Sequence, residues 1–292
     1  MKVLHVHAHF DDFEFVAAGT FELWRRRLAG DFRGRIIVCT DGRSGHHFRT
    51  RKETAAVRRA EQIESARIGG YEFHQLTRPD GSSFGEARTL TTELLAALWK
   101  SIRDFEPDYL LCPPLPVDTV AGVHPDHVTV AEAIRRMAYM INVPHAFLDE
   151  YPVPDETVSR WVKTPVILNT YDGYQAGSNR GDLVVDVAEA LEVIAAESWC
   201  HQCQIREWLP WIGRHQMPVA DSLEEWREVL RRRFARQARE LALPEGSVCE
   251  VFTLTAWGEL PQPGQLEADF PSLMGDPSRT ERLMAKLRRW SA

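Results

Sequence analysis

The sequence has no apolar run long enough to cross a membrane and no recognisable export signal. A transmembrane helix needs about 20 consecutive apolar residues, and no apolar run in this chain approaches that length. The N-terminus also lacks the basic region and apolar stretch of a secretory signal peptide. From these absences we expect a protein without a membrane span and with a cytoplasmic location.

The chain also lacks an excess of positive charge and a paired set of cysteines. The 35 Lys and Arg residues are outnumbered by 42 Asp and Glu residues, so the net charge of −7 argues against nucleic acid as a partner. The five cysteines are scattered, which favours free thiols over a disulfide framework. Cys200 and Cys203 form a single CxxC inside a helical pattern, and we do not expect it to have a redox or metal role.

What the first half does contain is an alternation of short apolar segments with helical patterns. Each apolar segment is followed by a turn signal or a polar cluster, which is typical of βαβ units. We therefore predict an α/β fold, with a Rossmann-like, mostly parallel sheet flanked by helices. The expected strands are residues 2–6, 35–40, 71–76 and 109–112, and the expected helices are 13–28, 51–68 and 90–105.

The second half has a less regular pattern. Further strands are expected near Phe147 and at 166–169, 183–187 and 248–254, with long helices at 188–208 and 223–241. There is no linker-like composition shift, repeat or low-complexity tract, so we expect residues 1–292 to form a single domain with an elaborated C-terminal half. Three tryptophans in this half are expected in the core rather than on a sugar-binding platform: Trp199, Trp208 and Trp211.

A cluster of histidines and acids follows the first predicted strand. His9 and Asp12 lie three residues apart where this strand turns into a helix, so both side chains can point at one position, while Asp11 between them points elsewhere. Ligands of open α/β sheets gather at the carboxyl ends of the strands. This cluster therefore predicts part of a metal site.

A second cluster, His124-Pro125-Asp126-His127, follows the fourth predicted strand, in what we expect to be a loop. A parallel sheet with right-handed crossovers would place both clusters at the same edge. A catalytic zinc has three protein ligands and an open position for water. His9, Asp12 and His127 would supply two imidazoles and a carboxylate, a set that suits zinc but also ferrous iron.

The remaining polar residues of the two clusters suggest hydrolysis. Asp11 is placed to accept a proton from a metal-bound water as general base. His124 is placed to meet a developing oxyanion or a leaving amine, with Asp126 orienting it and raising its pKa. A non-catalytic sugar- or nucleotide-binding module and a ferrous oxygenase stay open as alternatives. The absence of GxGxxG after the first strand disfavours a dinucleotide binder.

The two clusters resemble motifs of the PIG-L/LmbE-like deacetylases. Residues 8–14 (AHFDDFE) followed by 18–20 (AGT) are similar to the AHPDDxE…GGT signature, and residues 124–127 match the HPDH motif. Residues 40–42 (TDG) resemble the T(D/N)G loop, and residues 58–61 (RRAE) resemble the RxxE helix. With weaker positions near 107, 185, 201 and 250, the resemblance extends from about residue 3 to residue 254.

This resemblance implies a zinc enzyme that removes N-acetyl groups from N-acetylglucosamine-containing substrates, giving acetate and a free amine. It assigns zinc to His9, Asp12 and His127, and it gives Asp11, His124 and Asp126 the catalytic roles described above. Arg58 occupies a position that the family uses near the substrate; a salt bridge with Glu61 is an equal alternative. Glu14 is expected to support the site or to cap a helix.

Three departures from the family pattern are present. Phe10 replaces the usual proline of the first motif, which loosens the turn but removes no ligand. Ile194 lies near a position where many members have lysine, and residues 201–204 (HQCQ) replace the HxSQ-like segment; both lie in the half expected to shape the substrate pocket. An amidase that acts on a larger N-acyl or glucosaminyl conjugate is therefore the main alternative within the enzyme class. A small-molecule amino sugar is the expected partner, and a homo-oligomer is left open.

Overall fold

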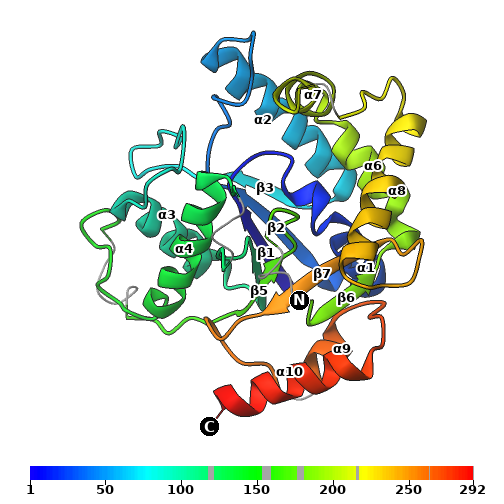
Figure 1. The fold of residues 1–292 in the computed structure, drawn as a ribbon. Helices are drawn as coiled ribbons and strands as arrows, with labels where there is room; N and C mark the ends of the chain where they lie inside the picture. The colour runs from blue at the N-terminus through cyan, green and yellow to red at the C-terminus, as the bar shows by residue number, and fades with distance from the viewer. Residues whose placement is uncertain (118–121, 153–158, 176–180, 215–216, 263, 292) are drawn as a thin grey trace.

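A computed structural model describes residues 1–117, 122–152, 159–175, 181–214, 217–262 and 264–291. In this part of the chain a seven-stranded sheet forms the centre of the molecule, with helices on both faces (Figure 1). The strands are β1 (Lys2–His7), β2 (Arg33–Val38), β3 (Glu72–Gln75), β4 (Tyr109–Cys112), β5 (Val166–Thr170), β6 (Leu183–Asp186) and β7 (Cys249–Leu254). The helices are α1 (Ala18–Leu28), α2 (Arg51–Gly69), α3 (Thr92–Phe105), α4 (Pro125–Met140), α6 (Leu191–Trp199), α7 (Leu209–Ile212), α8 (Leu223–Glu240), α9 (Gln265–Asp269) and α10 (Pro277–Trp290).

The sheet confirms the predicted fold class. Its order is β3-β2-β1-β4-β5-β7-β6, and the first five strands are parallel. Strand β7 runs antiparallel to both β5 and β6, so the C-terminal half extends the sheet at one end. The order of the first five strands is that of a Rossmann-like sheet. In such a sheet the strand order reverses between β1 and β4, which leaves a crevice at the carboxyl ends of these two strands.

Each face of the sheet has its own hydrophobic core. Along β1, Val3 packs into the core beneath α1, α6 and α8, whereas Leu4 and Val6 point into the core beneath α3 and α4. Figure 1 shows α3 and α4 on one side and α1, α6 and α8 on the other. Burial on both faces explains why Val3, Leu4 and Val6, which point to different sides of the sheet, are all apolar, and it also encloses His5 and His7.

Two of the expected secondary-structure assignments are wrong. The region around Phe147 forms turns and not a strand; Phe147 is buried there because its ring packs 5.8 Å from that of Trp99. The loop expected around the second polar cluster is the beginning of α4, with His124 as N-cap and Pro125 as the first helical residue. Proline favours the first helical position because its missing N–H has no partner there in any case.

The single long helix expected over 188–208 is interrupted. Helix α6 ends at Trp199, and a π-helical turn, η4 (Cys203–Trp208), follows it. Cys200 and Cys203 lie at this break and are free thiols, and the Sγ atom of Cys203 lies 2.8 Å from a carboxylate oxygen of Glu61 in α2. The break turns the chain so that His201 points inward, where it is fully buried.

The buried carboxylate of Glu250 links β7 to the first turn of α1. Glu250 of β7 accepts hydrogen bonds from the backbone N–H groups of Gly19 and Thr20, at 2.8 and 2.7 Å, and from the Thr20 hydroxyl at 2.5 Å. The first N–H groups of a helix have no partner within the helix, and a carboxylate there also interacts favourably with the helix dipole. This contact gives a physical reason for the Gly-Thr pair of the first motif and for the glutamate in β7.

Candidate active site and metal centre

The two polar clusters meet at the carboxyl edge of the parallel strands. His9 and Asp12 follow β1, while His124 caps α4 and His127 lies in its first turn. Because β1 and β4 are parallel neighbours, the segments that follow them emerge side by side. The structure therefore brings together the residues that the sequence placed 112 or more positions apart.

Three donor atoms form a nearly equilateral triangle. The Nδ1 atom of His9 lies 3.2 Å from the Nε2 atom of His127, and each lies 3.4 Å from the Oδ2 atom of Asp12. Ligand atoms that bind one tetrahedral zinc at 2.0–2.2 Å are about 3.3–3.6 Å apart. The spacing of these atoms and their nitrogen and oxygen character both fit a zinc ion.

Two other sets of donor atoms in the described residues also lie close enough together to hold an ion. One replaces Asp12 with His124, and the other combines His7, Asp12 and His127. His7 was not a sequence-based candidate, although its Nδ1 atom lies 2.5 Å from the Oδ2 atom of Asp12. The alternation of His5 and His7 along β1, continued by His9 just after it, was the signal, because alternate residues of a strand share one face.

The carboxylate of Asp126 has a different partner from the one expected. Its Oδ2 atom lies 3.2 Å from the Nε2 atom of His9, while its backbone N–H donates to the Nδ1 atom of His124 at 3.2 Å. Metal-binding histidines commonly pair their second nitrogen with a carboxylate, which fixes the ring orientation and its tautomer. Asp126 thus orients His9, whereas it contacts His124 through its backbone.

His124 lies at the exposed rim of the cluster, with its ring centroid 4.6 Å from that of His9. Burial and the neighbouring His9 and His127 lower the pKa of His124 to about 4, and the opposing effect of Asp126 is smaller. Asp126 thus raises the pKa of His124 as expected, but burial and the two histidines outweigh it, so the net shift is downward. In the neutral ring Nδ1 accepts the backbone hydrogen bond, so Nε2 carries the proton and is available as a donor.

Asp11 is not part of the triangle formed by His9, Asp12 and His127. Its φ angle of 83° places it in the left-handed region, which turns its side chain away from that of Asp12. Its Oδ1 atom accepts a hydrogen bond of 2.9 Å from the guanidinium of Arg58. Burial raises the pKa of Asp11 to about 6, while Arg58 acts in the opposite direction. A carboxylate with a pKa near neutrality suits general base catalysis.

A comparison with protein families agrees with this geometry. Residues 4–138, slightly less than half of the chain, match the family model described as PIG-L: GlcNAc-PI de-N-acetylase. Residues 4–138 are therefore a PIG-L-like segment. All the residues of the two polar clusters lie inside it. A comparison with curated proteins gave no match to this chain.

Solved structures show the same architecture over most of the chain. N,N'-diacetylchitobiose deacetylase from Pyrococcus horikoshii has 20% identity and a TM-score of 0.61, covering 88% of this chain and 84% of its own. The hydratase GalB from Pseudomonas putida, which acts on 4-carboxy-2-hydroxymuconate, has 15% identity and a TM-score of 0.59, covering 89% and 97%. A triple mutant of a deacetylase from teicoplanin biosynthesis has 14% identity and a TM-score of 0.53, covering 88% and 99%. At these identities the similarity is one of fold.

Within the PIG-L-like segment, Arg58 pairs with Asp11 and not with Glu61. Its guanidinium is buried and also donates to the backbone carbonyl of Phe10 at 2.7 Å and to that of Gly42 at 3.4 Å. Arg58 therefore connects the first motif with the loop that follows β2. A contact of Arg58 with the substrate remains a prediction.

Glu14 supports the site from the interior of the PIG-L-like segment. It accepts hydrogen bonds from Gln62 at 2.8 Å and Ser65 at 2.6 Å, and its Oε1 atom lies 3.0 Å from the Nε2 atom of His201. Although burial opposes it, the charge of Glu14 raises the pKa of His201. The side-chain oxygen of Gln62 in turn accepts the backbone N–H of Asp11 at 3.4 Å, so this buried network reaches the candidate base.

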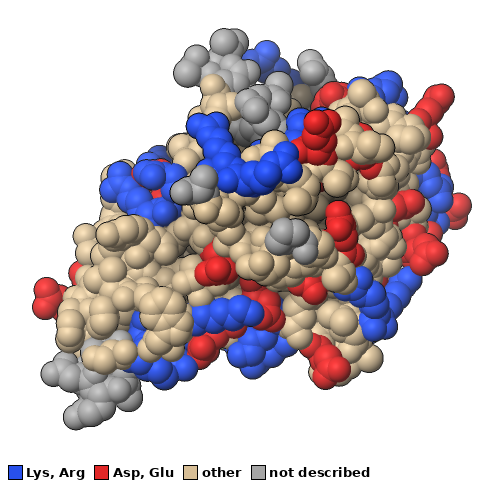
Figure 2. All heavy atoms as spheres, turned by 90° about the horizontal axis from the view of Figure 1, so that it is seen from below, with Lys and Arg blue, Asp and Glu red and all other residues tan. Residues whose placement is uncertain are grey.

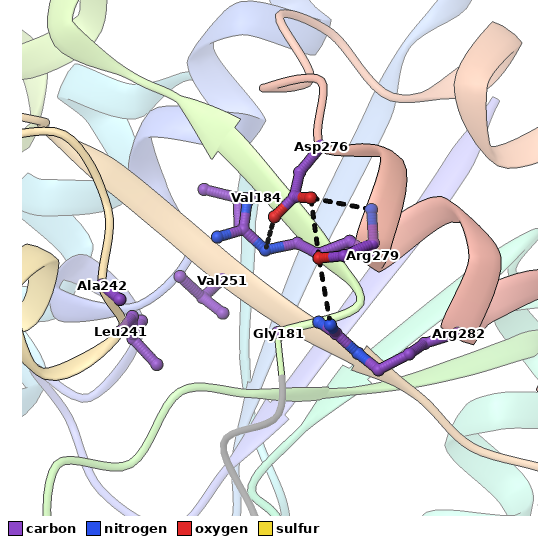
Figure 3. Close-up of a pocket in the computed structure, with 9 residues that line it drawn as sticks. Gly181, Val184, Leu241, Ala242, Val251, Asp276, Arg279 and Arg282 are labelled. Carbon is purple, nitrogen blue, oxygen red and sulfur yellow. Dashed lines mark hydrogen bonds and ion pairs between the residues drawn. The ribbon is translucent and has the colours of Figure 1, made fainter.

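A cavity of about 230 Å³ lies outside the PIG-L-like segment (Figure 3). It is formed by β6, β7, the end of α8 and the start of α10, and none of the candidate site residues lines it. Asp276 at its edge pairs with Arg279 at 3.5 Å, and Arg282 donates to Ser278 at 3.3 Å. Asp276 and Arg279 thus pair with each other, while Arg282 contacts a serine hydroxyl.

Positive and negative side chains are mixed on one face of the molecule. On the face drawn in Figure 2, the described Lys and Arg side chains are interleaved with Asp and Glu side chains. None of the described helices combines the length and the apolar character needed to span a bilayer.

Proposed function

We propose that this protein is a zinc-dependent hydrolase that removes an N-acetyl group from an N-acetylglucosamine-containing or related amino-sugar substrate, giving acetate and a free amine. The observation that carries this proposal is the triangle of donor atoms from His9, Asp12 and His127 beside a buried aspartate with a raised pKa. The match of residues 4–138 to the PIG-L family model supports the type of reaction.

His9, Asp12 and His127 would hold the zinc ion, and Asp126 would fix the ring of His9. A zinc ion bound there would supply Lewis acidity for the acetamide carbonyl and would lower the pKa of a bound water. Zinc is favoured over ferrous iron because the neighbouring aspartate, Asp11, suits hydrolysis.

Asp11 would take the proton of the attacking water, since its carboxylate is ionised at neutral pH yet basic enough to accept a proton. Arg58 would hold this carboxylate in place through the 2.9 Å hydrogen bond. The Nε2–H group of His124 would donate to the acetamide oxygen as negative charge develops on it. Because the pKa of His124 is low, protonated Asp11 is the group that would return the proton to the departing amine.

The amino-sugar substrate is supported by what two structures with this fold do. One is described as a deacetylase of N,N'-diacetylchitobiose and one as a deacetylase of teicoplanin biosynthesis. An amidase acting on a larger N-acyl or glucosaminyl conjugate would use the same groups, and a non-catalytic sugar-binding module would use none of them as acid or base. The GalB structure favours one further candidate, addition of water to a carbon–carbon double bond.

We also propose that residues 1–292 form a single domain, because β6 and β7 of the C-terminal half complete the sheet that β1 begins. A cytoplasmic location remains a prediction.

The proposal is tested by measuring metal content and acetate release in the same preparations. We expect about one zinc per chain in the wild type and acetate release from N-acetylglucosamine or N,N'-diacetylchitobiose. His127→Ala should lose both, and chelation should abolish activity until zinc is restored. His145→Ala, a histidine outside the site, is the matched control. Bound zinc without acetate release from any acetylated amino sugar would contradict the proposed reaction.

A further inference from the structure

An aromatic surface lies at the loop that follows β2. The ring of Trp211 is parallel to that of His47, with centroids 4.6 Å apart and an interplanar angle of 3°. Trp211 also stacks on Trp208, at 5.3 Å and 28°. The expectation that Trp211 belongs to the core is wrong, because it is 44% exposed.

The two rings that contact Trp211 lie close to each other, with the centroids of His47 and Trp208 6.4 Å apart. Offset rings on opposite faces of Trp211 would be at least about 7 Å apart, so we infer that both lie on one side of it and that its exposed surface is on the other. Phe48, which is 63% exposed, packs edge-on against His47 and widens the aromatic surface. We call Trp211 with its supporting rings His47 and Trp208 the Trp211 platform.

The platform is held in place by charged and polar contacts. Arg49, which follows His47 and Phe48 in the loop, donates to Glu207 of η4 at 3.0 Å. His46 contacts the same carboxylate at 2.9 Å. Gln204 donates to the backbone carbonyl of Gly45 at 3.1 Å. These contacts tie the loop to η4, so a ligand would meet a preformed surface with hydrogen-bonding groups at its edge.

The platform is linked to the candidate base through Arg58. Arg58 contacts Asp11 with one guanidinium nitrogen, and the other lies so near Gly45 that a Cβ atom there would be 2.7 Å from it. His47 follows Gly45 by two residues, so their Cα atoms are at most about 7.6 Å apart. Helix α7, which carries Trp211, directly follows η4, whose first residue Cys203 donates its backbone N–H to Glu61 of α2 at 2.8 Å; α2 also carries Arg58.

We propose that the open face of Trp211 binds a second pyranose ring of the substrate, next to the sugar that carries the acetamide. This inference rests on the proposed function and extends it to a substrate of at least two sugars. A pyranose has an apolar C–H face that fits a flat indole, and a rim of hydroxyls that can meet Arg49 and Glu207. A large exposed aromatic surface in a polar rim is typical of a binding site.

The test measures binding separately from catalysis. Asp11→Asn in the full-length, zinc-loaded chain is titrated calorimetrically with N,N'-diacetylchitobiose and with N-acetylglucosamine. Adding Trp211→Ala should weaken disaccharide binding about tenfold and leave monosaccharide binding within about twofold. Trp211→Tyr, which keeps a flat ring, should retain most of the affinity. Trp161→Ala is the matched control. Trp161 is 75% exposed and precedes β5, so it lies at the amino ends of the parallel strands, whereas the candidate site lies at their carboxyl ends.

Other outcomes would overturn the proposal in distinguishable ways. If both sugars bind and Trp211→Ala changes neither affinity, the platform is not a sugar site, while the proposed function stands. If Trp211→Ala weakens binding of N-octanoylglucosamine and not of the disaccharide, the platform binds an acyl chain instead. Equal losses for both sugars would show that Trp211 supports the site as a whole. If neither sugar binds to the zinc-loaded chain, the proposed function fails together with this inference.

Discussion

Asp11 combines a left-handed backbone with a buried carboxylate, and both properties bear on its proposed role. The φ angle of 83° separates its side chain from that of Asp12, so one aspartate can face the metal position while its neighbour faces Arg58. Aspartate tolerates this conformation better than most residues do. Two adjacent aspartates can therefore perform different tasks.

We expect Asp11→Asn to lower acetate release at least 100-fold, since a general base typically contributes about 10²- to 10⁴-fold. Zinc content should be unchanged, because Asp11 is not part of the donor triangle. The measurement is the turnover rate together with metal analysis, and Asp31→Asn, an exposed aspartate, serves as control. A metal-loaded variant that keeps a tenth or more of the wild-type rate would rule out the general base role.

At the scale of elements, the site depends on where helices begin and break. Helix α4 begins at the second polar cluster, and its first turn carries His127. The break between α6 and η4 turns His201 toward Glu14 and places Trp208 and Trp211 near the loop after β2. Helix α1, in turn, is held at its N-terminus by the glutamate of β7.

We expect Glu250→Ala to lower the free energy of unfolding by at least about 3 kcal/mol, since it leaves buried donors of α1 without a partner. Urea denaturation is the measurement, and Glu245→Ala, an exposed glutamate in the same region, should have little effect. Equal midpoints for wild type and Glu250→Ala would show that this contact is dispensable.

At the scale of the whole molecule, several carboxylates are buried on one side of the sheet. Burial, together with the charges of Glu14, Glu22 and Glu250, raises the pKa of Glu197 well above its ordinary value of 4.5. The unfolded chain releases this proton first as the pH increases. The contribution of Glu197 to stability is therefore present below pH 4.5 and is lost as the pH rises toward its pKa in the folded state.

We expect Glu197→Gln to unfold at the same temperature as the wild type at pH 4.5 and at least about 3 °C higher at pH 8, because the glutamine has no proton to lose. Thermal unfolding followed by circular dichroism at both pH values is the measurement. Glu189→Gln, a substitution at an exposed residue close to Glu197 in sequence, should give no such difference. A wild type that is as stable as the variant at pH 8 would contradict the raised pKa.

Local patterns in the sequence were enough to predict the fold class, the parallel order implied by alternating strands and helices, and the two polar clusters. These depend on local patterns: apolar runs that suit buried strands, and short motifs in which histidine and aspartate are spaced a few residues apart. The resemblance to PIG-L rested on the same motifs, and the family comparison confirmed it over residues 4–138.

The partner of each polar side chain and the exposure of each aromatic residue could not be predicted in the same way, because they depend on the folded structure. Asp126 is two residues from His124 in sequence, yet its carboxylate faces His9. Arg58 lies one helical turn from Glu61 but reaches Asp11. Trp211 is expected in the core from the sequence, and only the packing of η4 and α7 against the loop after β2 leaves it partly exposed. Such partners are set by contacts between segments far apart in the chain, and the local spacing of residues does not encode them.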